Sequence, residues 1–296
     1  MTEAELVADA HAIIGEGPWW DSRDLILYWI DVKGKRLHVF DPAKGTDRSV
    51  VLGSMPGLVV GRSSASRSSA SLLLAMERGF AFMDSDTGAT TPIYDPEADM
   101  PGNRFNDGKC DARGRLWAGT MADSEKGRTG SLYLFDPDLS CIRCLNGVGI
   151  SNGIAWSSDN RVMYYIDSPL SRVDAFDFDL ETGSLSGRRV AFDVPRSMGF
   201  PDGMTIDEEG MLWVALWEGW GLGRWDPRSG KLIEKVDVPV ARTSSCVFGG
   251  SNQDKLYITT AKVDLGPDGQ KEQPHAGGLF VFEPGIRGAS SVPFAG

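Results

Sequence analysis

One phrase that recurs along the whole chain restricts the possible folds more than any other feature. The phrase is a polar turn followed by a short apolar strand with an aromatic or aliphatic pair, as in DSRDLILYWI at 21–30 and DEEGMLWVAL at 207–216. The aligned copies share one anchor position, which is occupied by Tyr28, Leu73, Trp117, Tyr164, Trp213 and Tyr257. Successive anchors are 45, 44, 47, 49 and 44 residues apart. A repeat of about 40–50 residues is typical of one four-stranded propeller blade.

Six copies of this repeat predict an all-β fold, a six-bladed β-propeller with four-stranded blades around a central channel. No long segment has the 3.6-residue period of a helix, which disfavours helical repeats of similar length. The stretch LVADAHAII at 6–14 precedes the first copy. We expect the part near Val7–Ile13 to pair with the last blade and close the ring, because an unpaired strand edge is a liability. The Ser-rich run Ser63–Ser71 is predicted to form a flexible turn.

Composition and charge exclude several classes of protein. The formal net charge is −11, which argues against nucleic acid and anionic membranes as partners, because both require a basic surface. No run of about 18 apolar residues predicts a membrane span, and the N-terminus carries acids where a signal peptide needs bases. We therefore expect a cytoplasmic protein that is a monomer or a weak homo-oligomer. No composition break or Pro-rich linker divides residues 1–296, which we expect to form a single domain.

The cysteines do not indicate a disulfide scaffold in a chain of this length. There are four, Cys110, Cys141, Cys144 and Cys246. Cys141 and Cys144 form a C-x-x-C pair, which would suit redox or zinc chemistry. Because no second pair accompanies them, two reduced thiols near a strand end are the preferred interpretation.

The repeat alignment predicts which side chains meet at the axis. The innermost strand of each propeller blade lines the channel, so equivalent positions in different repeats lie at the same height. The position 11 or 12 residues before the anchor is occupied by Glu16, Asn106, Asn152, Asp202 and Ser245 in five of the repeats. A surface turn is also rich in Asp, Asn and Gly. Four acids or amides at one height of a ring nevertheless indicate a site in the channel.

Oxygen ligands without sulfur or imidazole favour a hard divalent cation. Glu16 and Asp202 supply two negative charges and Asn152 supplies a neutral carbonyl oxygen, so these three residues are the predicted metal ligands. Ca²⁺ is the preferred ion, with Zn²⁺, Mn²⁺, Mg²⁺ and Fe²⁺ as alternatives. Water and substrate would complete the coordination, and Asp202 would also act as the catalytic general base.

Four motifs resemble the family of senescence marker protein (regucalcin), gluconolactonase and bacterial sugar lactonases. They are GEGPWW at 15–20, NRFNDGKCDARGRLWAGTM at 103–121, SNGIAWS at 151–157 and FPDGMTID at 200–207. The resemblance covers nearly the whole chain and implies a six-bladed propeller that hydrolyses aldono-lactones. It also implies that Glu16, Asn152 and Asp202 bind the metal, that Asp202 is the base, and that Arg104 and Asn106 contact the sugar lactone.

The chain departs from that family at one position. Some members carry a carboxylate that contacts sugar hydroxyls where this chain has Ser124, and Asp123 and Glu125 are the candidates to replace it. Trp217 and Trp220 follow the fifth copy of the phrase. They are expected either to form an apolar wall for the sugar ring or to pack between blades.

Two other functions stay open from the sequence. A phosphotriesterase-like or paraoxonase-like propeller hydrolase would share the fold and the metal, but versions that depend on histidine need histidines in the channel. The three histidines, His11, His38 and His275, share no position in the repeat and are predicted to be structural or on the surface. A non-enzymatic calcium-binding propeller or scaffold is the second alternative, and a scaffold has no need of carboxylates at its axis.

Overall fold

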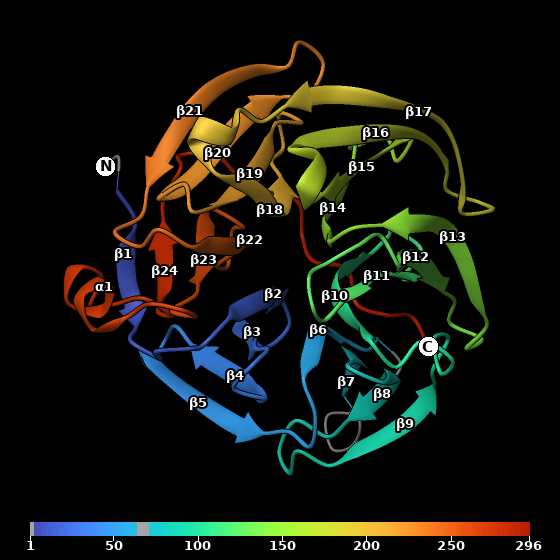
Figure 1. Cartoon of the computed structure of the whole chain (residues 1–296), viewed down its shortest axis with the longest axis horizontal. Coiled ribbons are helices and arrows are strands. Elements are labelled where there is room, and N and C mark those ends of the chain that lie inside the picture. Colours follow the sequence, from blue (N-terminus) through green and yellow to red (C-terminus); the bar gives the residue numbers. More distant parts are fainter. Residues whose placement is uncertain (1–2, 64–70) are drawn as a thin grey trace.

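The structure is a computed structural model that describes residues 3–63 and 71–296. Within these residues, six four-stranded antiparallel sheets form a ring around a central channel (Figure 1). The predicted six-bladed β-propeller is thereby confirmed. The Ser-rich run Ser63–Ser71 falls mostly on residues 64–70, outside the described residues.

Each blade is a simple meander that runs outward from the channel. Blade one is β2 (Gly15–Asp21), β3 (Ile26–Asp31), β4 (Arg36–Asp41) and β5 (Thr46–Val51). Blade two is β6 (Pro56–Gly61), β7 (Leu72–Met76), β8 (Gly79–Met83) and β9 (Thr90–Tyr94). Blade three is β10 (Asn103–Cys110), β11 (Leu116–Ala122), β12 (Gly130–Phe135) and β13 (Cys141–Val148). Blade four is β14 (Ser151–Trp156), β15 (Val162–Asp167), β16 (Arg172–Asp179) and β17 (Ser184–Asp193). Blade five is β18 (Phe200–Ile206), β19 (Leu212–Trp217), β20 (Gly221–Asp226) and β21 (Lys231–Asp237).

The sixth blade joins the two ends of the chain. Its strands are β22 (Thr243–Gly249), β23 (Lys255–Thr260), β24 (Leu279–Phe282) and, outermost, β1 (Glu5–Ala8). Glu5 pairs with Val281, so the N-terminal strand closes the ring as expected. The strand ends at Ala8 rather than continuing to Ile13. Beyond it the chain turns, and the backbone N–H of Ile13 donates to the Asp31 carboxylate at 2.9 Å.

The repeated phrase has a clear structural role. Its anchor residues all lie on the second strand of a blade, and Trp117 and Trp213 are fully buried there. The indole N–H of Trp117 donates to Asp111 at 3.0 Å, and that of Trp213 donates to Asp207 at 2.9 Å. The polar turn of the phrase therefore supplies the hydrogen-bond partner that a buried tryptophan requires.

The C-terminal segment, residues 283–296, crosses the end of the channel where the innermost strands finish. The N–H of Ala289 donates to the carbonyl of Ile206 at 3.0 Å, and the N–H of Phe294 donates to that of Gly61 at 2.8 Å. Phe294 is fully buried and stacks on Phe135, with ring centroids 5.5 Å apart. Figure 1 shows this red segment passing behind the ring toward blade three. It closes one mouth of the channel and leaves the other available for a ligand.

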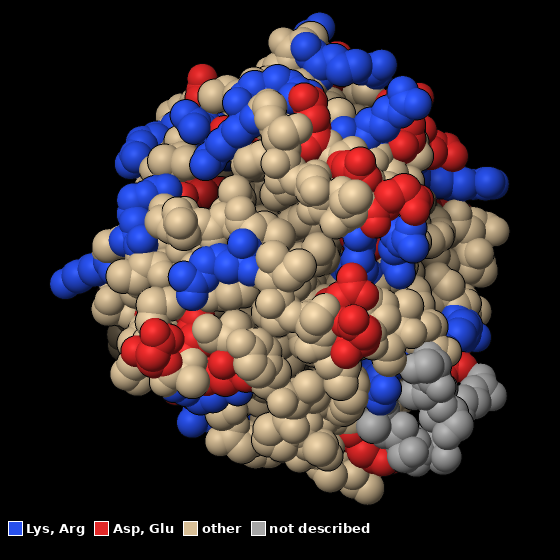
Figure 2. Space-filling view, turned by 90° about the vertical axis from the view of Figure 1, so that its right-hand side faces the viewer, with Lys and Arg blue, Asp and Glu red and all other residues tan. Residues whose placement is uncertain are grey.

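Helices and disulfides contribute little to the described part of the chain. Its one α-helix, α1 (Pro267–Glu272), lies in the sixth blade's loop, and no helix there is long and apolar enough to cross a membrane. All four cysteines are free, and Cys141 and Cys144 lie on the outermost strand β13. On the face seen in Figure 2, acidic and basic side chains are interspersed.

Candidate functional site

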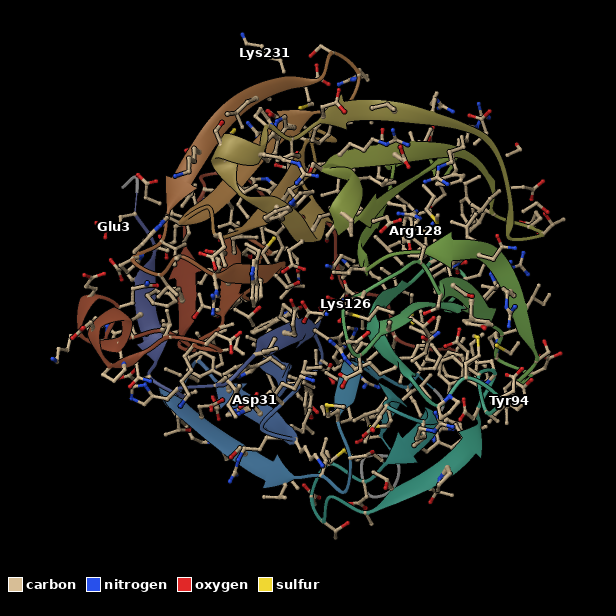
Figure 3. The ribbon with its side chains drawn as sticks, in the orientation of Figure 1. Glu3, Asp31, Tyr94, Lys126, Arg128 and Lys231 are labelled. Atoms are coloured by element: carbon tan, nitrogen blue, oxygen red, sulfur yellow. The ribbon has the colours of Figure 1, made fainter. Side chains whose placement is uncertain are left out.

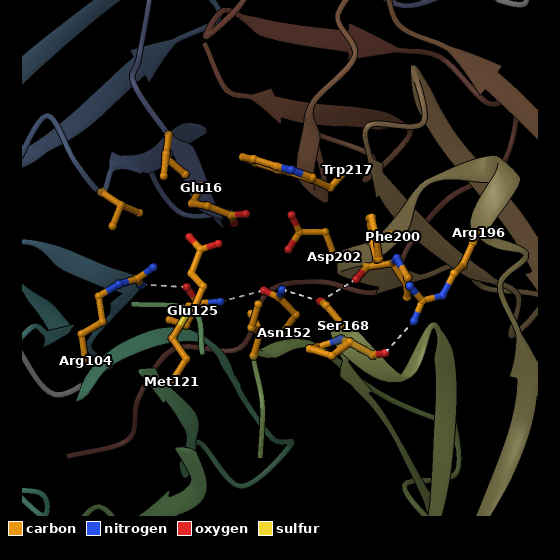
Figure 4. A pocket seen from close by; sticks show the side chains of 16 residues that line it. Glu16, Arg104, Met121, Glu125, Asn152, Ser168, Arg196, Phe200, Asp202 and Trp217 are labelled. Carbon is orange, nitrogen blue, oxygen red and sulfur yellow. Dashed lines mark hydrogen bonds between the residues drawn. The ribbon is translucent and has the colours of Figure 1, made fainter. Parts of the chain in front are cut away.

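A pocket of about 360 Å³ lies at the open mouth of the channel. The predicted residues Glu16, Arg104, Asn106, Asn152 and Asp202 all line it (Figure 4). They come from β2, β10, β14 and β18, and each lies in the first half of its strand. Because innermost strands of successive blades start at the same mouth, residues far apart in sequence meet here.

A β-bulge accompanies each of these positions. The pairing register shifts between Glu16 and Trp19 and between Phe105 and Gly108, and it shifts again between Ser151 and Ile154 and between Pro201 and Met204. A bulge frees one residue from regular pairing and re-aims its side chain, which is why bulges are common next to active sites. The bulges turn the acid and amide side chains into the channel.

Glycines beside the predicted metal ligands allow neighbouring innermost strands to approach closely. A Cβ on Gly153 would lie 2.8 Å from the carbonyl oxygen of Asp202, and one on Gly203 would lie 2.1 Å from the hydroxyl of Ser245. Any side chain at either position would push the strands apart. Close packing between neighbouring strands thus explains why glycine follows Asn152 and Asp202 in the sequence motifs.

The carboxyl groups of Glu16 and Asp202 have no cationic partner in the described part of the chain that would balance their negative charge when they ionise. Glu16 and Asp202 are both buried, and within the described residues neither forms an ion pair. Burial, reinforced by the charge of Asp107, raises the pKa of Glu16 to about 8. Burial, reinforced by the charge of Glu16, raises the pKa of Asp202 well above its ordinary range. The nearby cation, Arg104, is already paired with Asp123, its Nε lying 3.1 Å from Oδ1.

A second pair of charged groups lies below the pocket. Asp107 and Lys109 line a cavity of about 20 Å³, and the Lys109 ammonium donates to the carbonyl of Met204 at 2.7 Å. Burial raises the pKa of Asp107 and lowers that of Lys109, and each charge partly offsets the shift of the other. Ser245, the blade-six residue of the predicted register, lines this lower cavity and not the pocket.

Hydrogen bonds link the pocket residues in one continuous chain (Figure 4). Arg104 Nη1 donates to Asn106 Oδ1 at 2.8 Å, and Asn106 Nδ2 donates to Asn152 Oδ1 at 3.0 Å. Asn152 Nδ2 donates to the hydroxyl of Ser168 at 2.8 Å, and that hydroxyl donates to the carbonyl of Pro201 at 2.6 Å. This chain of hydrogen bonds connects the predicted substrate-binding residues, Arg104 and Asn106, with a predicted metal ligand, Asn152.

The donor set suits a hard divalent cation. The predicted ligands Glu16, Asp202 and Asn152 offer two carboxylates and one amide oxygen to the pocket, and its described lining contains no thiolate or imidazole. The described residues contain no group of three or more His, Cys, Asp or Glu placed to hold a metal. Two acids and an amide nevertheless provide oxygen ligands, and the unbalanced charge of Glu16 and Asp202 is the charge that a divalent ion would neutralise.

The loop between β11 and β12 brings a third carboxylate to the mouth. Of the two candidates to replace the missing family carboxylate, Glu125 lines the pocket. Asp123 instead pairs with Lys33, at 2.7 Å, and with Arg104. Figure 3 shows Lys126 of the same loop near the centre of the ring, whereas Tyr94 lies at the rim. Glu125 has a left-handed φ of 59°, which is an uncommon conformation for a residue other than glycine.

The two tryptophans expected near the site have different positions. Trp217 lines the pocket together with Phe200 and forms part of its apolar wall. Trp220 does not line it and is 44% exposed. Of the two tryptophans, Trp217 therefore forms part of the apolar wall and Trp220 does not.

Histidines are absent among the described residues that line the pocket. His38 is buried in blade one, where it contacts Asp47 at 2.6 Å and stacks on Trp29. His11 and His275 both lie near Asp9 and are partly exposed. The structure thus places all three outside the site.

Sequence reasoning missed several pocket residues that do not belong to an innermost strand. Ser168 begins the 3₁₀-helix η1 (Ser168–Leu170) after β15, and Arg196 begins η2 (Arg196–Met198) before β18. Loops between strands vary in length, so the repeat alignment gives them no common position. Only the folded chain brings these loops over the channel.

Comparisons with known proteins cover nearly the whole chain. The family model described as "SMP-30/Gluconolactonase/LRE-like region" matches residues 14–262. The putative sugar lactone lactonase YvrE of Bacillus subtilis (strain 168) is 39% identical over 294 residues, 99% of each chain. Regucalcin of Xenopus laevis is 38% identical over 289 residues, which are 96% of this chain and 95% of its own. The crystal structure of a calcium-binding protein, regucalcin from Agrobacterium tumefaciens, superimposes with a TM-score of 0.92 at 27% identity, covering 99% of this chain and 97% of that one.

Proposed function

The chain belongs to the SMP-30/gluconolactonase/LRE-like family, and from this premise we propose that it is a metal-dependent lactonase that hydrolyses sugar lactones to aldonic acids. One observation carries the proposal. The buried carboxylates of Glu16 and Asp202 meet in the pocket without an ion-pair partner among the described residues, beside the fixed guanidinium of Arg104. Such an arrangement is costly unless a cation and a substrate use it.

In this proposal Glu16, Asn152 and Asp202 hold one divalent cation, for which Ca²⁺ is the preferred candidate. The relatives named regucalcin include one described as calcium-binding, which supports this choice. Such an ion, when bound, polarises the lactone carbonyl and stabilises the negative charge that develops on its oxygen. It also keeps both carboxylates ionised, which makes Asp202 available as a base.

Asp202 acts as the general base. It accepts a proton from the water whose oxygen forms a bond with the lactone carbonyl carbon. The bond between that carbon and the ring oxygen then breaks, and the ring oxygen leaves as a hydroxyl by taking up the proton that Asp202 had accepted from the water. The product is the open-chain hydroxy acid, which ionises to its carboxylate. General-base catalysis of this kind contributes about 10²–10⁴-fold in rate.

Arg104 and Asn106 orient the substrate. The Arg104 guanidinium is buried and held by Asp123 and by the carbonyl of Phe105, so it meets a sugar hydroxyl or the new carboxylate without losing further side-chain freedom. Asn106 Oδ1 has a second lone pair beyond the one that Arg104 uses. Glu125 accepts a hydrogen bond from another sugar hydroxyl, and Trp217 covers an apolar face of the ring.

The test is hydrolysis of a panel of aldono-lactones by metal-stripped and remetallated protein, followed by proton release and corrected for spontaneous opening. We expect no turnover after stripping and recovery with stoichiometric Ca²⁺ or another divalent ion. Hydrolysis at the same rate in stripped protein would contradict the proposal. Ion binding without lactone turnover would support a calcium-binding propeller, and faster cleavage of phosphotriesters than of lactones would support the other hydrolase class.

A further inference from the structure

The hydrogen-bond chain across the pocket runs in one direction, and we propose that Ser168 is a positioning residue that fixes the orientation of the Asn152 amide and thereby the cation affinity of the site. Ser168 lies outside the innermost strands and outside the residues assigned above to metal, base or substrate. The inference rests on the proposed function in one respect, namely that Asn152 is a metal ligand.

One end of the hydrogen-bond chain is fixed by Arg104, a group that can only donate. An arginine guanidinium has no acceptor, so the atom of Asn106 that faces Arg104 must be its oxygen. The amide nitrogen of Asn106 then faces the other way and donates to the carbonyl of Ser151 at 2.8 Å as well as to Asn152. Since the Ser151 carbonyl can only accept, it confirms the same orientation of Asn106.

The other end of the hydrogen-bond chain is fixed by the carbonyl of Pro201, a group that can only accept. The carbonyl of Pro201 lies 2.6 Å from the Ser168 hydroxyl, which must therefore donate its single proton there. The hydroxyl is left with lone pairs alone, and the atom of Asn152 that faces it at 2.8 Å must be the amide nitrogen. Ser168 is buried, and its own N–H donates to the carbonyl of Ile150 at 3.1 Å, so its position is well held.

Both ends thus require the same orientation of the Asn152 amide, with Oδ1 toward Asn106 and the pocket. One lone pair of that oxygen accepts from Asn106 and the second is available to a cation. In the reversed orientation two N–H groups would face the cation and repel it. Among the described residues, the Ser168 hydroxyl is the only acceptor that contacts Asn152 Nδ2, so its loss leaves that nitrogen without a partner and the amide held from the Asn106 side alone.

A purely structural role would have a different consequence. The Ser168 hydroxyl also joins η1, which follows blade four, to β18 of blade five. If this tether were its whole role, removing the hydroxyl would lower the melting temperature and leave cation affinity unchanged. The positioning role and the structural role are separated by measuring both the melting temperature and the cation affinity of the same variants.

The experiment is calorimetric titration of the metal-stripped full chain with Ca²⁺, together with thermal unfolding. Ser168→Ala is expected to bind Ca²⁺ about 10–100-fold more weakly, the usual effect of removing a group that orients a metal ligand. Ser168→Thr keeps the hydroxyl. Ser168→Val has the shape of threonine but lacks the hydroxyl. The threonine variant is expected to keep affinity within about threefold of the unaltered chain, and the valine variant to lose it as alanine does.

The matched control is Ser171→Ala at the other end of the same short helix. Ser171 is also buried, but its hydroxyl has no partner among the described residues, so its loss should leave Ca²⁺ affinity unchanged. Equal affinities of the Ser168 alanine or valine variants and the unaltered chain would overturn the inference alone. Absence of cation binding by the unaltered chain would overturn the proposed function and this inference with it. If the alanine variant does not fold, the threonine and valine pair decides the question.

Discussion

Glu16 on β2 and Asp202 on β18 extend into the same pocket, and the charge of Glu16 reinforces burial in raising the pKa of Asp202 (Figure 4). Residues 186 positions apart in sequence thus form one electrostatic unit. Without a cation between them, the two carboxylates destabilise the folded chain whenever both are ionised. With a divalent ion, the same proximity becomes favourable.

The stability of the metal-stripped protein should therefore fall as the pH rises. The pKa of Glu16 is about 8 in the folded chain against an ordinary 4.5, so between these values the folded state holds a proton that the unfolded state has lost. The free energy of unfolding then decreases with pH, by at most about 1.4 kcal/mol per pH unit for this proton. Urea denaturation in the presence of a chelator, at pH 5, 6, 7 and 8, measures the slope.

Glu16→Gln serves as the comparison, because glutamine keeps the shape and has no proton to lose. The difference in unfolding free energy between the variant and the unaltered chain should grow in favour of the variant from pH 5 to pH 8. A constant difference across this range would show that Glu16 does not hold a proton in the stripped protein.

Glu16→Gln should weaken cation binding, although it should favour the stability of the metal-stripped protein as the pH rises. Glu16→Gln removes half of the formal charge that opposes the ion, and we expect Ca²⁺ affinity to fall about 10²–10⁴-fold, in line with the about 3–5 kcal/mol for breaking a buried charge pair. In the unaltered chain, affinity should increase from pH 6 to pH 8 as the competing proton leaves Glu16. Metal analysis after dialysis gives the occupancy, and unchanged occupancy in the variant would refute Glu16 as a ligand.

Much of the fold follows from the sequence because a propeller repeats one local pattern. The anchors fall on second strands because each copy contains the same turn, strand and turn, and the innermost strands follow by counting back from the anchors. The same counting predicts that four side chains lie at one height of the channel, namely Glu16, Asn106, Asn152 and Asp202. This prediction is possible because each of these residues occupies a fixed position in an innermost strand.

What the sequence could not give lies in the loops and at the chain end. Ser168, Glu125 and Arg196 reach the pocket from connections of different length, which have no common register. The C-terminal segment crosses the channel through backbone hydrogen bonds, which leave no side-chain pattern to read. The sequence pattern also does not distinguish Trp217, which lines the pocket, from Trp220 in the following turn, which does not.

Glu125 is expected to bind substrate and not the ion. Glu125→Gln keeps the size of the side chain but weakens its acceptance of a sugar hydroxyl, and we predict an increase in KM of about tenfold, the loss of one charge-assisted hydrogen bond. Ca²⁺ affinity should change by less than about threefold. Ser124→Ala, one residue away, is the control and should change neither quantity. An unaltered KM for Glu125→Gln would refute Glu125 as the replacement for the family's carboxylate.

The C-terminal segment should stabilise the ring without taking part in the chemistry. Phe294→Ala removes a fully buried ring that stacks on Phe135, and large-to-small changes of this kind cost about 3–5 kcal/mol. Chemical denaturation measures the loss. Because the pocket lies at the opposite mouth, kcat at a temperature where the variant is folded should stay within about twofold. A large fall in kcat together with small destabilisation would contradict this separation.

The most direct measurement is lactone turnover by Asp202→Asn at saturating metal. Asparagine keeps the shape and one carbonyl oxygen but loses the charge and the basicity, so the ion should bind more weakly and still reach full occupancy at high concentration. At that occupancy we predict that turnover falls about 10²–10⁴-fold, because the general base is missing. Proton release from an aldono-lactone, corrected for spontaneous opening and paired with metal analysis of the same sample, gives both quantities. Hydrolysis at the unaltered rate by the fully metallated variant would contradict the proposed mechanism, even if the propeller and the ion site stand.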